Sequence, residues 1–336
     1  MKIVVTQRIH PEISSMLAAH GMLVANESLD RWPREELLAH ARDANALMVF
    51  MPDSLDDAFL SACPNLRIVA AALKGADNFD IAACTRLGIW FALVTDLLSE
   101  PTAELAVALM LSLARNVAPG DALIRTGHFQ AWRPTLYGTG LAGSTVGLIG
   151  YGAVGCELAR LLEGFACRVQ FHDPARDGSI ALDHLLATSD FVLPLVPLTR
   201  ETFHLLNAVA LAQMKRGVYL INVSRGSVVD ENAVADALES GHLAGYAADT
   251  FEMEDWARAD RPREINPRLL RLTDRTLFTP HLGSAVANVR REIERAAATN
   301  IIAALDGQPP PGAVNSPCGA RTRMCRVDTR VDAERP

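Results

Sequence analysis

Three short segments of the chain carry an arginine, a glutamate and a histidine, each just after a run that predicts a β-strand. Arg225 lies in NVSRGSVVD, Glu254 in DTFEME and His281 in TPHLGS. An arginine grips an oxyanion through several N–H groups, and a histidine takes or gives one proton near neutral pH. A glutamate bonded to that histidine would set its tautomer. Singly, each residue has a structural explanation, but three together at strand ends predict a catalytic set.

A glycine-rich segment, TVGLIGYGAVG, predicts a dinucleotide site, because its GxGxxG pattern follows an apolar strand and opens a helix. Gly150 would make the tight turn, Gly152 would let the backbone approach a pyrophosphate, and Gly155 would let the helix pack on the strand. The next strand ends at Asp173, whose carboxylate suits a ribose 2′-hydroxyl and disfavours a 2′-phosphate. The pattern therefore predicts NAD as the cofactor, although Arg176 nearby would soften the preference over NADP.

The elements that position these residues alternate along the chain as short apolar runs and helical segments, which is typical of parallel α/β sheets. Four strands are expected before residue 99, at residues 3–6, 46–50, 66–71 and 88–92, and six follow residue 145. Long helices are expected at 102–115, capped by Ser99, and at 285–305. We therefore predict an α/β fold with two Rossmann-like domains, a flavodoxin-like substrate domain and a NAD-binding Rossmann domain, joined by two long crossing helices.

The expected domain limits follow from this alternation. Residues 1–100 and 287–307 would form the substrate domain, and residues 101–286 the NAD-binding domain with a dimerisation helix and loop. The Pro-rich stretch 308–336 is predicted to be a flexible tail. Only fifteen residues separate Asp173 from Ser189, so we expect the adjoining edge of the Rossmann sheet to be trimmed.

Composition excludes several classes of protein. The chain has 336 residues and is 49% hydrophobic, which is enough for two domains. Its apolar runs fall short of the ~20 residues that span a bilayer, and the N-terminus has no signal-peptide pattern. A formal charge of −7 gives no basic footprint for nucleic acid. The six cysteines lack metal-ligand spacing, which predicts a reducing, cytoplasmic compartment and no metal site.

The quoted motifs, with SDFVLPLVPLTRETFHLLN and INVSRGSVVDENAVADALESGHLAGYAADTFEMED, resemble the D-isomer-specific 2-hydroxyacid dehydrogenase family up to about Gly307. The resemblance implies that Arg225, Glu254 and His281 are the catalytic residues and that Asp249 contacts the nicotinamide amide. The remaining residues expected to contact the cofactor, besides those of the glycine-rich turn and His281 itself, are Ala153, Val154, Val196, Pro197, Val223 and Gly283.

The segment KGADNFD departs from the family pattern, because Lys74 stands where relatives commonly carry a small polar residue. Lys74, beside Gly75, would join Arg225 in one small site, and two positive charges suit a compact anion with more charge than a monocarboxylate. The segments FMPD, LKGADNFD, FQAWRPTLYGTGL and FEMEDWARADRPR resemble the phosphite dehydrogenases of that family. This resemblance implies NAD-dependent oxidation of phosphite to phosphate.

The same resemblance implies further substrate-binding residues. Met51, Trp132 and Tyr137 would close the pocket, and Ser284 would add a hydroxyl beside His281. Alternatively, the two aromatic residues pack in a dimer interface, since the apolar helix 102–115 and their loop predict a homodimer.

Two other functions stay open. The first is a D-2-hydroxyacid dehydrogenase of the glycerate or phosphoglycerate type, in which Lys74 would be a solvated loop residue. The second is a NAD-binding corepressor without enzymatic activity, which would not need the three catalytic residues together.

Overall fold

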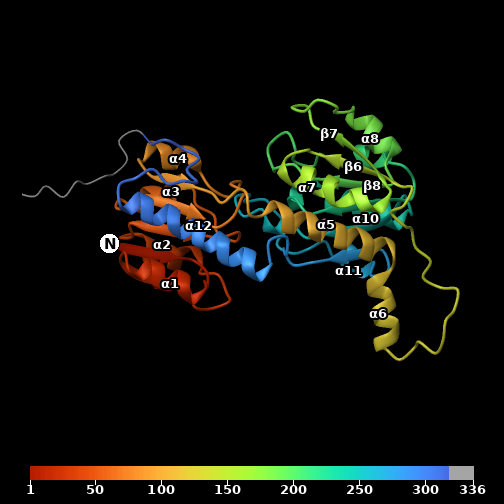
Figure 1. Ribbon diagram of the computed structural model, residues 1–336, viewed down its shortest axis with the longest axis horizontal. Helices are drawn as coiled ribbons and strands as arrows, with labels where there is room; N and C mark the ends of the chain where they lie inside the picture. Colours follow the sequence, from red (N-terminus) through yellow and green to blue (C-terminus); the bar gives the residue numbers. More distant parts are fainter. Residues whose placement is uncertain (318–336) are drawn as a thin grey trace, which may run out of the picture.

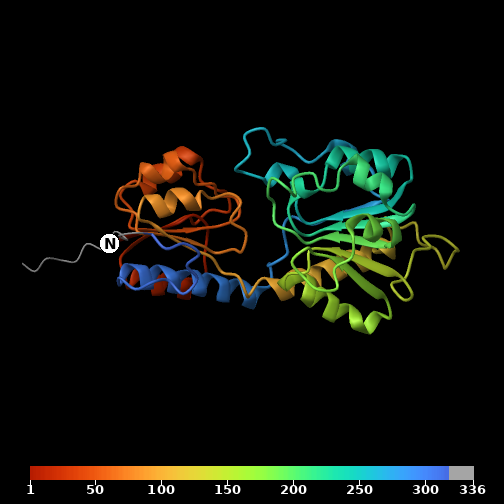
Figure 2. The ribbon, with the colours of Figure 1, turned by 90° about the horizontal axis from the view of Figure 1, so that it is seen from above.

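The computed structural model describes residues 1–317 and shows two parallel β-sheets, each covered by helices on both faces (Figures 1 and 2). The two α/β units lie side by side, and the long helices α5 and α12 point toward each other where the chain crosses between them. The predicted α/β architecture with two Rossmann-like units is confirmed.

The first sheet has the strand order β2-β1-β3-β4-β5, and every pairing in it is parallel. Its strands are β1 (Lys2–Val5), β2 (Met22–Ala25), β3 (Ala46–Val49), β4 (Ile68–Ala71) and β5 (Trp90–Ala92). This is the flavodoxin-like order. Sequence analysis missed β2, because an edge strand of four half-exposed residues has no long buried run to mark it.

Two groups of helices bury the faces of this sheet. One face packs against α1 (Pro11–Ala18) and α12 (Ala287–Leu305), so the last long helix of the chain returns to the first sheet. The other face packs against α2 (Arg34–Ala41), α3 (Asp57–Ser61) and α4 (Ile81–Arg86).

The second sheet has the strand order β11-β10-β9-β8-β6-β7, again parallel throughout. Its strands are β6 (Thr145–Ile149), β7 (Arg168–His172), β8 (Phe191–Pro194), β9 (Val218–Asn222), β10 (Leu243–Ala248) and β11 (Thr276–Phe278). All six strands expected after residue 145 are present. The sheet ends at β7, and only α8 (Leu182–Thr188) separates β7 from β8 along the chain.

Helices cover the second sheet in the same manner. On one face lie α5 (Ser99–Ala114) and α7 (Ala153–Leu162), followed by the short η1 (Glu163–Phe165). The other face carries α8, α9 (Ala208–Gln213), α10 (Glu231–Glu239) and α11 (Pro267–Arg271). Two further 3-10 turns, η2 (Gly226–Val228) and η3 (Glu252–Glu254), follow strands β9 and β10.

Two expectations about α5 need correction. The helix begins at Ser99 itself and the residue before it is Leu98, so Ser99 is not its N-cap. Most apolar side chains of α5 pack inside the second unit, so they do not form an exposed dimerisation surface. The exposed apolar side chains lie instead on α6 (Val117–Arg125) and on the loop that follows it, which both project from the body (Figure 1).

Residues 308–317 do not form part of a flexible tail. Ala313 makes an antiparallel bridge with Ala92, and the Val314 amide donates to the Phe91 carbonyl at 2.9 Å. The side chain of Asn315 accepts from the Phe91 amide at 2.8 Å and donates to the Ile89 carbonyl at 3.0 Å. This stretch therefore runs along the edge strand β5; the rest of the predicted tail lies outside the described residues.

Among residues 1–317, no single helix has the length and apolar composition needed to cross a membrane. Helices α5 and α6 pass that test only as a pair, and they are bent by 63° at their junction.

Candidate active site

The predicted site residues follow the carboxyl ends of strands from both sheets. Arg225 follows β9, Glu254 follows β10 and His281 follows β11, while Lys74 follows β4 of the first sheet. A cavity of about 570 Å³ lies between the two units at these strand ends. The predicted residues that border it are Met51, Lys74, Gly75, Gly152, Ala153, Val154, Val196, Pro197, Val223, Arg225, Asp249, His281, Gly283 and Ser284.

His281 and Glu254 form a close pair, with 2.6 Å between Nδ1 of the histidine and Oε2 of the glutamate. The second glutamate oxygen accepts from the Phe251 amide at 2.9 Å, which orients the carboxylate. With Nδ1 engaged, the Nε2 atom of His281 is the one available for proton transfer. His281 also has a φ of 57°, a conformation that costs a non-glycine residue free energy and is common at functional sites.

Asp249 holds the turn that carries His281. Its Oδ1 atom accepts from the Thr279 hydroxyl at 2.5 Å and the Leu282 amide at 2.7 Å, and its Oδ2 atom accepts from the Gly283 amide at 2.9 Å. The side chain is buried, and burial raises its pKa while these bonds oppose the shift. Asp249 therefore positions the turn that carries His281. The sequence predicted a contact of Asp249 with the cofactor and gave no sign of this positioning role.

The guanidinium of Arg225 is fixed by the first unit as well as by its own loop. Its Nε atom donates to both oxygens of Asp77, at 3.0 and 3.1 Å, and Nη1 donates to the Ser224 carbonyl at 2.8 Å. A Cβ atom built on Gly75 would lie 1.6 Å from Nη2, so only glycine fits beside this guanidinium. The motif KGADNFD contains Asp77, but its spacing carried no signal for this contact, because Asp77 and Arg225 lie 148 positions apart.

Lys74 borders the same cavity as Arg225 and His281. Its Nζ atom donates to the Ser99 hydroxyl at 3.2 Å, across the junction between the two units. Burial lowers the pKa of Lys74, and the nearby charge of Asp96 partly offsets that effect. The structure therefore brings two cationic side chains to one cavity.

A narrow hollow of about 20 Å³ opens directly onto the catalytic residues. It is lined by Arg225, Glu254 and His281, with Met51 and Gly75 from the first unit. It adjoins the larger cavity, because Met51, Gly75, Arg225 and His281 border both.

The loops that carry Arg225 and Glu254 are joined to each other. A Cβ atom on Gly226 would lie 1.9 Å from the carbonyl carbon of Phe251, so glycine permits η2 to approach η3. Asp255 then accepts from both the amide and the hydroxyl of Ser227. Asp255 thereby links the loop of Arg225 to the loop of Glu254.

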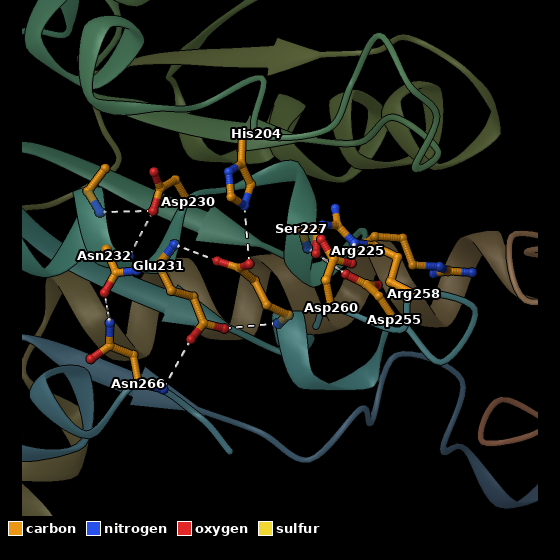
Figure 3. A network of polar contacts seen from close by, with 12 residues as sticks. His204, Arg225, Ser227, Asp230, Glu231, Asn232, Asp255, Arg258, Asp260 and Asn266 are labelled. Carbon is orange, nitrogen blue, oxygen red and sulfur yellow. Dashed lines mark hydrogen bonds and ion pairs between the residues drawn. The ribbon is translucent and has the colours of Figure 1, made fainter. Parts of the chain in front are cut away.

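A polar network that includes His204, Glu231 and Asn266 also holds this region (Figure 3). Glu252 and Glu231 bind each other's backbone amides, with both bonds at 2.9 Å. The Nε2 atom of His204 lies 3.1 Å from a carboxylate oxygen of Glu252, and this carboxylate raises the pKa of the histidine. The second oxygen of Glu231 accepts from the Asn266 amide at 3.1 Å. The turn that carries Glu254 is therefore held from several elements.

The glycine-rich turn fits a dinucleotide. Gly150 has a φ of +99°, and a Cβ atom there would lie 2.9 Å from the Leu195 carbonyl oxygen. A Cβ atom on Gly155 would lie 2.7 Å from the Gly150 carbonyl, whereas Gly152 faces open space. Gly150 and Gly155 thus shape the turn without bordering the cavity, and Gly152 leaves room for a pyrophosphate at the N-terminus of α7.

Asp173 follows β7 and lies beside the glycine-rich turn. One of its oxygens accepts from the Tyr151 amide of the glycine-rich turn at 2.9 Å, and such backbone bonds lower its pKa. A separate cavity of about 400 Å³, bordered by Tyr151, Cys156 and Arg176, opens beside it.

Trp132 and Tyr137 do not reach the cavity within one chain. Both side chains are exposed, at 78% and 76%, on the loop after α6. That loop projects from the second unit on the side remote from the first (Figure 1). Within one chain these side chains do not border the cavity, so closing it would require the loop of a partner chain, and this role stays a prediction.

Arg290 is a cationic residue near the cavity that the sequence patterns did not single out. It lies on α12, is largely buried against the ring of Phe50, and Nη1 donates to the Ala72 carbonyl. This places a further cation close to the ends of β3 and β4.

Comparisons with known proteins agree with this geometry. Residues 107–283 match the profile described as the D-isomer specific 2-hydroxyacid dehydrogenase, NAD binding domain. A glyoxylate reductase of Thermofilum pendens is 38% identical over 328 residues, which covers 94% of each chain. The crystal structure of the TT0316 protein from Thermus thermophilus superposes with a TM-score of 0.86 at 33% identity, covering 94% of this chain and all of that one.

A further similar structure is an NADPH-dependent glyoxylate/hydroxypyruvate reductase from Sinorhizobium meliloti in complex with NADP and malonate. It is 27% identical, with a TM-score of 0.79 and coverage of 93% of this chain and 96% of that one. The chain belongs to the D-isomer specific 2-hydroxyacid dehydrogenase family and carries its NAD-binding domain.

Proposed function

We propose that this protein oxidises phosphite to phosphate with NAD⁺ as the hydride acceptor. One observation carries the proposal: Lys74 and Arg225 border the same cavity as His281. Asp77 also borders this cavity and pairs with the Nε atom of Arg225, so Lys74 supplies the additional positive charge, which suits a small oxyanion.

Four side chains have separate roles in this reaction. Lys74 and Arg225 hold the oxyanion and stabilise the negative charge that grows as water adds to phosphorus. The P–H bond breaks with its electron pair leaving as hydride, while a P–O bond forms from water. His281 takes the proton of that water at Nε2, and Glu254 stabilises the imidazolium through Nδ1.

The cofactor supplies the hydride acceptor when bound. Gly152, Ala153 and Val154 would hold its pyrophosphate, and Val196 and Val223 would contact its apolar surfaces. Asp173 favours an unphosphorylated ribose, so we propose NAD rather than NADP, although a similar reductase was crystallised with NADP.

The second candidate is a D-2-hydroxyacid dehydrogenase or glyoxylate reductase. The names of the most similar relatives favour it. In that case Arg225 holds a carboxylate, and His281 exchanges a proton with the hydroxyl or carbonyl oxygen of the substrate. The hydrogen bond from Lys74 to Ser99 would then be structural.

One assay separates the candidates. Purified protein with NAD⁺ is given phosphite, D-glycerate or D-lactate, and NADH formation is followed by absorbance; NADH consumption with glyoxylate is followed in parallel. We expect turnover with phosphite, abolished in Arg225→Ala and weakened in Lys74→Ala. Turnover of the organic acids alone would replace the first candidate with the second.

We also propose that the protein forms a homodimer through α6 and its following loop. The exposed apolar side chains of this segment are Val117, Ile124, Phe129, Trp132, Leu136 and Tyr137. A cluster of this kind on one projecting segment is typical of an interface between copies. In such a dimer the loop of one chain can extend toward its partner.

A further inference from the structure

A second cavity between the two units takes no part in the proposed reaction. It has a volume of about 500 Å³ and is bordered by residues of both units. The arginines and tryptophans among them are Arg31, Trp32, Arg34, Trp256, Arg258 and Arg261. The first three belong to the first unit and the others to the segment that follows η3.

Two of these arginines stack on one aromatic ring. The guanidinium carbon of Arg31 lies 3.9 Å from the ring centre of Trp256, and that of Arg261 lies 4.3 Å from it. Stacking uses the flat face of a guanidinium and leaves its N–H edge free to bind an oxyanion. Arg261 uses Nε and Nη1 on the backbone carbonyls of Met253 and Arg258, which holds its remaining edge in place.

The carboxylates that border the cavity are already engaged. Asp56 caps α3 and pairs with Arg34, and Asp80 caps α4. Asp77 pairs with Arg225, and Asp53 is buried and accepts hydrogen bonds from a hydroxyl and a backbone amide.

Arg31 and Arg261 therefore form no ion pair with a carboxylate among the residues that the structure describes; Asp53 and Asp255 act on them only at longer range. Burial lowers the pKa of Arg261, and so does the charge of Arg263 and of Arg31. The positive charges of Arg31 and Arg263 act against that of Arg261, and this repulsion raises the free energy of the empty cavity. A bound anion offsets that repulsion and satisfies the free N–H edges.

We propose that this cavity is a second anion site, which binds a multivalent inorganic oxyanion between Arg31 of the first unit and Arg258 and Arg261 of the second. Arg258 adds a guanidinium stacked at 3.8 Å on Phe203, and its ion-pair partner Asp260 is 76% exposed and weakly held. An anion bound to both units holds them together next to the active site, where the Ala257 amide also donates to Asn78 at 3.0 Å.

Sulfate binding to the full-length Lys74→Ala variant tests the proposal, because this background weakens the active-site anion site, leaves the pair of Arg225 with Asp77 intact and requires no turnover. Titration calorimetry gives the stoichiometry, and the fluorescence of Trp32 and Trp256 reports occupancy; sodium chloride keeps the ionic strength constant. We expect one sulfate per chain. Adding Arg31→Gln or Arg261→Gln should weaken binding by about tenfold or more, because each removes a charge-assisted bond.

The matched control is Arg271→Gln, which removes an exposed arginine of α11 away from the cavity. It should leave sulfate affinity unchanged, and circular dichroism should show that all variants are folded. The proposal is overturned by an absence of saturable binding in the Lys74→Ala background, by binding that Arg31→Gln and Arg261→Gln both leave intact, or by an equal loss in Arg271→Gln. None of these results bears on whether phosphite is oxidised.

Discussion

His281 combines an unfavourable backbone conformation with a short bond to Glu254, so its imidazole is held in one orientation. His281→Asn should lower kcat by at least ~10²-fold, which is the usual contribution of a positioned acid or base. Glu254→Gln should lower kcat less and shift the pH profile, because the imidazolium loses its carboxylate. Steady-state kinetics between pH 5 and pH 9 measures both. A Glu254→Gln profile identical to that of the wild type would contradict this pairing.

Lys74 gives a second prediction at this scale. Burial lowers its pKa, and an anionic substrate needs the charged ammonium. KM for phosphite should therefore be low at neutral pH and rise as the pH passes upward through that lowered pKa, which lies below the usual value of about 10.4. Lys74→Arg keeps its charge throughout this range, so the alkaline rise in KM should disappear. Persistence of the same rise in Lys74→Arg would assign it to another group.

At the scale of elements, the approach of η2 to η3 depends on Gly226. Gly226→Ala forces a methyl group against the Phe251 backbone. Overpacking of this kind should lower the free energy of unfolding by roughly 1–3 kcal/mol and reduce kcat, since the loops of Arg225 and Glu254 separate. Gly140→Ala is the control, because its methyl group would meet nothing within 4 Å. Equal effects of the two substitutions on thermal unfolding and kcat would refute this account.

The segment along β5 is a second element whose contribution can be measured. Asn315→Ala removes the acceptor of the Phe91 amide and the donor to Ile89. Losing these bonds should cost about 1–3 kcal/mol of unfolding free energy, as determined by urea denaturation. Ser316→Ala, an exposed neighbour, should change it little. If Asn315→Ala were as stable as that control, the segment would not be anchored by this side chain.

Sequence patterns predicted the elements that are long and apolar, and they placed the catalytic residues at strand ends. They missed β2, because its four residues are half exposed. They also missed that residues 308–317 pack along β5, because the hydrogen bonds of this stretch join segments more than 200 residues apart. The contacts of Asp77 with Arg225 and of Asp255 with Ser227 were equally invisible, because they depend on how two loops meet in space. Short-range spacing carries no information about such pairs.

On the scale of the whole molecule, α6 and its loop leave apolar side chains on a projecting segment, which we assign to a dimer interface. Ile124→Glu should place a charge in that interface and convert the dimer to a monomer. Size-exclusion chromatography with light scattering reports the mass. Leu29→Glu is the control, since Leu29 is 87% exposed on the first unit. A monomeric wild type, or an Ile124→Glu variant that remains dimeric, would contradict the assignment.

We propose that hydride passes from phosphorus to the cofactor in the cleft between the two units. Deuterated phosphite tests it most directly, with the products followed by mass spectrometry of the nicotinamide and by phosphorus NMR. The account predicts one deuterium in each NADH formed and one phosphate for each NADH. NADH that carries no deuterium, or phosphite left unchanged while glyoxylate is reduced, would contradict it and assign the protein to the organic-acid branch of its family.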